Sequence, residues 1–229
     1  MPEKVKENDK YVWVDKVSAT FILFIGGRMD LSRYDIIVDI DKSGSMGTKD
    51  CNGRSRWEAA QEATVAIARK AVEFDTDGIT VAFFAGNFVE YNNVDGEQKV
   101  VDIFNGNEPM GGTNTARVLE HQIAGYFARK AAGEAKPIII LVVTDGEPDS
   151  REDVARVIVD ATHRMDVDEE IGIQFIQVGS DAGAQSFLKW LDDELVDRKG
   201  AKFDIVDTKT MDELEGMRIA DVMVAAISD

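Results

Sequence analysis

The sequence predicts an α/β fold, doubly wound, with a mostly parallel central sheet, one antiparallel edge strand, and helices on both faces. Two observations carry this prediction. From residue 34 onward, short runs of β-branched residues alternate with longer segments whose apolar residues recur at helical spacing. The short runs are also apolar at nearly every position, which is typical of strands covered on both faces. Strands that alternate with helices imply parallel pairing and a layered domain.

The predicted strands are bounded by Gly, Asp or Pro and are five to seven residues long. The strong ones are residues 35–40, 79–85, 137–143, 172–178 and 202–206. Residues 88–94 and 99–104 resemble weaker strands on either side of Asp95-Gly96, a dipeptide that favours a hairpin turn. This hairpin predicts the antiparallel strand at one edge of the sheet.

The predicted helices lie between the strands and after the last of them. They cover residues 55–74, 113–132, 150–164, 182–195 and 210–227. Ser55 with Glu58, and Thr210 with Glu213, have the spacing of capping boxes, in which a hydroxyl and a carboxylate satisfy backbone N–H groups of the first turn. These pairs support helix starts next to residues 55 and 210.

Residues 1–33 do not follow the alternation and are assigned as a β-rich N-terminal extension to a domain over residues 34–229. Residues 11–25 are rich in β-branched and aromatic side chains and end at Gly26-Gly27. They fit either a strand added to the sheet or an arm that docks on a partner, and the added strand is the favoured interpretation.

Composition excludes several functional classes. The 229 residues include 26 Lys and Arg against 43 Asp and Glu, a net charge of −17, which would repel the phosphates of nucleic acid. One Cys and two His leave too few ligands for a typical zinc centre. The segment at 19–27 is too short to span a membrane, and residues 1–15 lack the apolar core of a secretion signal. We therefore expect an acidic, cytoplasmic protein that binds neither nucleic acid nor membrane.

Three loops carry oxygen-bearing side chains that the predicted topology brings together. Asp41, Ser43 and Ser45 follow the first strand of the domain, Thr113 precedes a helix, and Asp145 follows the strand at 137–143. In an open parallel sheet, ligands bind at the carboxyl ends of the strands. Two carboxylates, three hydroxyls and water suit a hard divalent cation, with Mg²⁺ first and Mn²⁺ or Ca²⁺ as alternatives.

At these residues the chain resembles the von Willebrand factor A (VWA) family and its metal-ion-dependent adhesion site. The family pattern of Asp-x-Ser-x-Ser, a distant Thr and a later Asp falls on Asp41, Ser43, Ser45, Thr113 and Asp145, so all five positions are intact. The resemblance implies a binding module without catalytic residues, in which the cation accepts an Asp or Glu of a protein partner. Ser43, Ser45 and Thr113 are then direct ligands, while the two aspartates bind through water or switch to direct contact.

Two other functions fit parts of the sequence. The cation could serve only to stiffen the loops of a structural subunit. Alternatively, Asp39 and Asp41 match the Asp-x-Asp opening of haloacid-dehalogenase-like phosphatases, in which the first Asp is the nucleophile. That scheme leaves Ser45 and Thr113 unexplained. Asp39 also departs from the apolar residue that VWA domains have there, so it needs a hydrogen-bond partner or acts beside Asp41.

Overall fold

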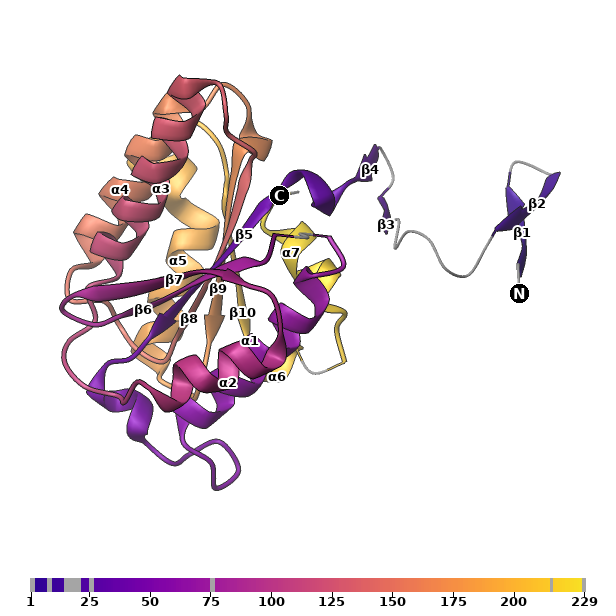
Figure 1. The fold of residues 1–229 in the computed structure, drawn as a ribbon. Coiled ribbons are helices and arrows are strands. Elements are labelled where there is room, and N and C mark those ends of the chain that lie inside the picture. Colours follow the sequence, from indigo (N-terminus) through magenta and orange to yellow (C-terminus); the bar gives the residue numbers. More distant parts are fainter. Residues whose placement is uncertain are drawn as a thin grey trace. The chain divides into compact units, whose positions relative to one another are not determined.

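The computed structural model describes residues 3–7, 10–14, 22–24, 27–74, 77–214 and 216–227. Contacts divide the chain into two compact units, Met1–Asp30 and Leu31–Asp229. The second unit contains the six-stranded sheet (Figure 1). All the predicted ligand residues also belong to it.

The central sheet has the strand order β10-β9-β8-β5-β6-β7. Its strands are β5 (Asp35–Asp41), β6 (Ile79–Phe84), β7 (Phe88–Val94), β8 (Ile138–Thr144), β9 (Ile171–Gln177) and β10 (Val206–Thr210). All neighbours pair in parallel except β6 with β7, so the antiparallel edge strand is confirmed. The chain leaves β5 toward β6 on one side and returns to β8 on the other, which places the topological switch point between β5 and β8.

Helices cover both faces of the sheet, as predicted (Figure 1). One face carries α3 (Thr115–Ala132), α4 (Arg151–Arg164) and α5 (Ala182–Lys199), and the other carries α1 (Arg56–Ala71), α2 (Glu97–Asn105) and α7 (Ile219–Ala225). Three short 3₁₀ turns complete the fold: η1 (Leu31–Arg33), η2 (Gly44–Gly47) and η3 (Asp168–Glu170). The capping box of Ser55 and Glu58 is confirmed at the start of α1.

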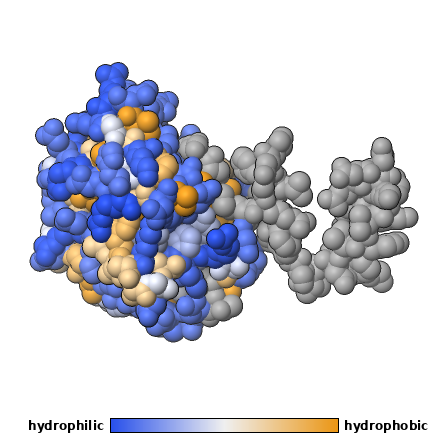
Figure 2. Space-filling model, turned by 90° about the horizontal axis from the view of Figure 1, so that it is seen from above, coloured by the Kyte–Doolittle hydropathy of each residue, from blue (hydrophilic) through white to orange (hydrophobic). Residues whose placement is uncertain are grey.

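The core lies between the sheet and these helices. Strands β8 and β9 are buried at every position, because both of their faces are covered. The surface seen in Figure 2 is mostly hydrophilic, with apolar residues interspersed. Among the residues that the structure describes, no helix is long and apolar enough to cross a membrane.

The hairpin predicted around Asp95-Gly96 is wrong. Residues 99–104 lie within helix α2, and β7 instead pairs with β6 through the turn at residues 85–87. Val100 and Phe104 are both buried, four residues apart, so one face of the segment packs on the domain as a helix would. Its β-branched residues had favoured a strand.

Two C-terminal boundaries also differ from the prediction. The last strand is β10, four residues later than the predicted 202–206, and the predicted helix 210–227 is divided into α6 (Met211–Leu214) and α7. Gly216, at φ 88°, lies between these two helices in the left-handed region that favours glycine. Thr210 and Glu213 still form their reciprocal hydrogen bonds at the start of α6.

The first unit contains two antiparallel pairs of its own. Strand β1 (Glu3–Glu7) pairs with β2 (Lys10–Val14), and β3 (Ile22–Phe24) pairs with β4 (Gly27–Met29). None of these described strands belongs to the six-stranded sheet. The described strands pair within the extension, an added strand in the six-stranded sheet stays a prediction, and residues 15–21 and 25 lie outside the described residues.

Candidate metal centre

Three loops meet at the carboxyl ends of β5 and β8, beside the switch point of the sheet. Backbone hydrogen bonds join the loop after β5 to its neighbours: Lys42 N–H donates to Phe84 O at 2.8 Å, Met110 N–H to Lys42 O at 2.6 Å, and Gly44 N–H to Gly111 O at 3.3 Å. The position is the one that open α/β sheets use for ligands. The predicted convergence of the loops is therefore present in the backbone itself.

Asp41 ends β5 and is completely buried. Its Oδ1 accepts the backbone N–H of Ser43 at 2.7 Å, and its Oδ2 accepts the hydroxyl of Thr144 at 2.7 Å. Burial raises the pKa of Asp41 to about 6, against the hydrogen bonds from Ser43 and Thr144, which lower it. The carboxylate is thus oriented by two donors but remains short of positive charge.

Two consecutive hydrogen bonds connect side-chain oxygens of Ser43, Ser45 and Asp145. Ser43 Oγ lies 3.0 Å from Ser45 Oγ, and Ser45 donates a hydrogen bond of 2.9 Å to Asp145 Oδ1. Ser43 is 2 % exposed and Asp145 is fully buried, whereas Ser45 lies at the surface. The set is therefore open on the side of Ser45 and closed beneath.

The donor set fits a small hard cation. Adjacent oxygen ligands of an octahedral Mg²⁺ at 2.0–2.1 Å are about 3 Å apart, and the two contacts through Ser45 measure 3.0 and 2.9 Å. A cation would also supply the positive charge that the buried Asp41 lacks. Within the described part of the chain, no group of three or more His, Cys, Asp or Glu side chains could hold a metal. Any cation here therefore depends on the serine and threonine hydroxyls.

Thr113 is fixed by a residue of the loop after β8. Asp149 Oδ1 accepts the backbone N–H of Thr113 at 2.9 Å, and the N–H of Asp149 donates to Thr113 O at 2.8 Å. Gly112 lies so close to Asp149 that a Cβ at residue 112 would come within 3.1 Å of its carboxylate. Asp149 therefore anchors the loop that carries the third hydroxyl.

Arg56 enters the site although the sequence analysis does not include it. Its Nη1 donates to Asp145 Oδ2 at 2.7 Å, and its other nitrogens donate to Asp50. Thr144 was also missed, although it directly precedes Asp145. The sequence gives no sign of the hydrogen bond from Thr144 to Asp41, because the two residues lie on different strands. It does place Arg56 at the start of a capped helix.

Asp39 has the partner that its position in a central strand requires. Its side chain is completely buried, and its Oδ1 accepts Nε2 of Gln122 at 3.1 Å, while Oδ2 has no hydrogen-bond partner among the described residues. Burial raises the pKa of Asp39 to about 8, which the Gln122 hydrogen bond partly opposes and the nearby Glu90 adds to. Among the described residues, the side chain of Asp39 is hydrogen-bonded by Gln122 and by none of the predicted ligands, so the first alternative, a hydrogen-bond partner, describes it.

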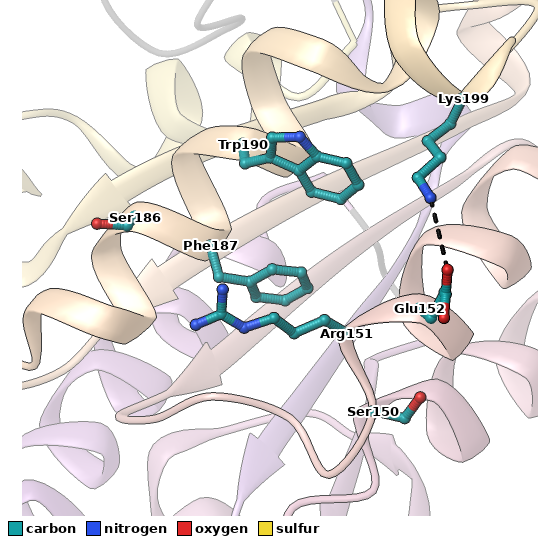
Figure 3. A pocket seen from close by; sticks show the side chains of 7 residues that line it. All are labelled: Ser150, Arg151, Glu152, Ser186, Phe187, Trp190 and Lys199. Carbon is teal, nitrogen blue, oxygen red and sulfur yellow. Dashed lines mark ion pairs between the residues drawn. The ribbon is translucent and has the colours of Figure 1, made fainter.

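A pocket of about 640 Å³ lies between α4 and α5, close in sequence to the loop of Asp145 (Figure 3). Arg151 and Lys199 lie over the rings of Phe187 and Trp190, at 5.2 and 5.8 Å from the ring centroids. Arg151 also pairs with Glu147, which follows Asp145 by two residues. The pocket thus borders one of the three loops, although it contains none of the predicted ligands.

Part of the chain matches the model of a known family. The model of the von Willebrand factor type A domain matches residues 36–147, a range that contains all five predicted ligands. Comparison with curated proteins gives no match.

Several solved structures share the fold. The manganese-loaded TRAP protein of Plasmodium vivax is 14% identical, with a TM-score of 0.58 over 82% of this chain and 72% of that one. The VWA domain of SpRpn10 is 10% identical, with a TM-score of 0.58 over 82% of this chain and 93% of that one. A mutant of the PilB minor pilin from Streptococcus sanguinis is 14% identical, with a TM-score of 0.60 over 88% and 62%. At these identities the likeness concerns the fold alone. Residues 36–147 are thus similar to the von Willebrand factor type A domain, and the fold is similar to those of these solved structures.

Proposed function

We propose that this chain is a metal-dependent protein-interaction module that binds an acidic side chain of a protein partner through a divalent cation, with Mg²⁺ as the first candidate. VWA domains are a family of such interaction modules. The observation that carries the proposal is the spacing of Ser43 Oγ, Ser45 Oγ and Asp145 Oδ1, at 3.0 and 2.9 Å, at the carboxyl end of the sheet. Ser43, Ser45 and Thr113 would hold the cation directly.

Neutral hydroxyl ligands favour binding over a purely structural role. A cation held mainly by Ser43, Ser45 and Thr113 keeps most of its charge, because hydroxyls donate less negative charge than carboxylates do. Asp41 and Asp145 are already engaged by protein donors, namely Thr144 and Arg56. The cation would then attract a carboxylate from outside the protein more strongly than any other group in the site does. An Asp or Glu side chain of a partner supplies such a carboxylate.

A structural subunit is the second candidate. In that case the cation would serve to hold the three loops together. The loops are already joined by backbone hydrogen bonds, including those from Met110 to Lys42 and from Asp149 to Thr113. This leaves less for a cation to stabilise and favours recognition as its role.

The phosphatase interpretation has less support. Its nucleophile would be Asp39, which is fully buried and accepts a hydrogen bond from Gln122. A nucleophile has to reach its substrate within hydrogen-bond distance. A phosphatase of this kind also needs a later acidic residue, and the candidate Asp192 lies within α5 and accepts the N–H of Thr208 at 3.1 Å. We therefore propose that the chain is not an enzyme.

The net charge of −17 restricts the partner. A strongly negative protein repels an acidic ligand at long range. A partner that surrounds its Asp or Glu with Lys or Arg would be attracted by the surface and still deliver its carboxylate to the cation. Binding should therefore weaken as the salt concentration rises.

The test is affinity capture of partners with and without Mg²⁺, using the wild type and the Asp41→Ala and Thr113→Ala variants. A partner that is retained with Mg²⁺, released by a chelator, and absent from both variants supports the proposal. Glu152→Ala provides a control, because Glu152 is 90% exposed and lies outside the site. Capture that survives the chelator contradicts a metal-dependent interaction. Stabilisation by Mg²⁺ without any Mg²⁺-dependent capture would instead favour the structural role.

A further inference from the structure

We propose that Arg56 is a positioning residue that keeps Asp145 from binding the cation with both of its oxygens. This inference rests on the proposed metal-dependent function and adds a part of the site that the family pattern does not contain. It concerns how strongly the cation is held and how much of its charge remains for a partner.

Arg56 is held in place by hydrogen bonds of its backbone and of its guanidinium group. Its backbone N–H donates to Thr48 O at 2.9 Å. Its Nε donates to both oxygens of Asp50, at 3.1 and 3.0 Å, and its Nη2 donates to Asp50 Oδ2 at 2.5 Å. This fork fixes the plane of the guanidinium and directs Nη1 at Asp145 Oδ2, 2.7 Å away. The side chain of Arg56 is 14% exposed, so the arrangement is largely shielded from solvent.

The neighbouring loop leaves room for the guanidinium. Gly179 follows β9, and a Cβ at this residue would lie only 2.6 Å from Nε of Arg56. Its φ of +77° also disfavours any side chain. The space beside Arg56 therefore exists because residue 179 is glycine. Three separate segments, those of Asp50, Asp145 and Gly179, define the position of one guanidinium.

The consequence falls on Asp145. Its Oδ2 is taken by Arg56, and only Oδ1 faces the hydroxyl of Ser45. A carboxylate that shares its charge with a guanidinium is a weaker ligand, and one free oxygen cannot bind a cation in bidentate fashion. The cation is then held less tightly, and water or a partner's carboxylate completes its shell. Arg56 thus favours exchangeable ligands over a closed site.

The experiment measures Mn²⁺ binding and the number of inner-sphere waters by water-proton relaxation, in the purified 229-residue chain without any partner. Arg56→Gln removes the guanidinium. Arg56→Lys keeps the charge but has only one donor group, which cannot hold Asp50 and Asp145 together. Arg54→Gln is the matched control, because it removes the same charge from a residue that pairs with Glu62 outside the site. Circular dichroism confirms that each variant is folded.

We expect Arg56→Gln to bind Mn²⁺ about tenfold more tightly than the wild type, because the substitution removes a positive charge beside the cation and frees Oδ2 of Asp145. It should also retain about one water fewer, because the freed Oδ2 of Asp145 would take one coordination position from water. Arg56→Lys should lose the same water, since the constraint depends on the fork rather than on charge. Arg54→Gln should match the wild type in hydration.

Unchanged hydration in both Arg56 variants would overturn the inference, as would weaker binding of Mn²⁺ by Arg56→Gln. Loss of the water in Arg56→Gln but not in Arg56→Lys would overturn the positioning role in favour of simple charge. A folded wild type that binds no Mn²⁺ would overturn the proposed function, and this inference with it. If only the proposed role of Arg56 is wrong, the wild type still binds Mn²⁺, and this distinguishes the two failures.

Discussion

Nε2 of Gln122, on helix α3, donates a hydrogen bond of 3.1 Å to Oδ1 of Asp39, in the middle of strand β5. The same amide nitrogen lies 3.2 Å from Oε2 of Glu90 on β7. Between the two acidic residues in the sheet lies Ala82, which pairs with both in register. A small residue on β6 thus leaves room for Gln122 to reach two carboxylates on either side of it.

The Asp39–Gln122 pair predicts a non-additive effect on stability. Gln122→Leu removes the donor from a buried carboxyl group and should lower the free energy of unfolding by about 1–3 kcal/mol. Combining it with Asp39→Val removes both partners and should recover most of that loss. Urea unfolding of the two single variants and the double variant measures the coupling. Additive losses would show that the hydrogen bond contributes little.

The carboxyl group of Asp39 also marks the limit of sequence reasoning at this position. The apolar run at residues 35–40 predicts that residue 39 lies in a buried strand, where its carboxyl group needs a partner. The partner lies 83 positions away on α3, in a helix whose sequence contains no unusual feature around Gln122. Only the packing of that helix on the sheet identifies it.

Thr144 should affect the affinity for a cation although it is not a predicted ligand. Its hydroxyl donates to Oδ2 of Asp41 at 2.7 Å, and both side chains are buried. Thr144→Val keeps the shape of the strand but leaves this oxygen without its donor. We expect about tenfold weaker Mg²⁺ binding, as for other residues that orient metal ligands.

Isothermal titration with Mg²⁺ checks this prediction for Thr144→Val. Thr80→Val serves as the control, because Thr80 makes its hydrogen bond to Asn92 on the edge pair of strands and away from Asp41. Equal affinities for wild type and Thr144→Val would show that the orientation of Asp41 does not depend on this hydroxyl.

Glu170 predicts a loss of stability in acid. Burial alone would raise its pKa, but hydrogen bonds from Lys130, Tyr126 and the backbone N–H of Asp166 outweigh burial and lower the pKa to about 2. The folded pKa lies below the unfolded value, so the carboxylate stabilises the protein above pH of about 4.5, and this contribution disappears as the pH falls toward 2. Its size is about 3 kcal/mol.

The measurement for Glu170 is urea unfolding of wild type and Glu170→Gln between neutral pH and about pH 2.5. The variant should be less stable at pH 7, and the difference should shrink as the pH falls. Glu152→Gln, at a residue 90% exposed, should follow the wild type throughout. A difference between wild type and Glu170→Gln that stays constant with pH would contradict the assigned pKa.

The sequence predicted most of the fold because hydrophobic periodicity dominates in buried elements. Strands β5, β8 and β9 are enclosed on both faces, and their continuous apolar runs could only fit the interior. The errors fall where that signal is weak. Strand β10 lies at an edge and pairs only with β9, so it tolerates the polar sequence VDTKT, whereas the apolar residues before it form no strand.

The ligands of the candidate site were predictable from the sequence, but the hydrogen bonds that orient them were not. Asp41, Ser43 and Ser45 are close in sequence, and their spacing is informative by itself. Asp145 and Thr113 become informative only through the order of strands in an open sheet. Arg56 was absent from the sequence analysis because nothing in a capped helix start indicates that its first side chain turns toward a loop 89 positions away.

The proposed function depends on a divalent cation held by the three hydroxyls and the two aspartates. The most direct test is the melting temperature of the wild type with and without Mg²⁺, compared with a variant that carries both Ser43→Ala and Ser45→Ala. A ligand that binds only the folded state stabilises it, by about 2.7 kcal/mol at a concentration one hundred times its Kd. We predict that Mg²⁺ raises the melting temperature of the wild type and leaves that of the double variant unchanged. An identical melting temperature of the wild type with and without Mg²⁺ would contradict the account.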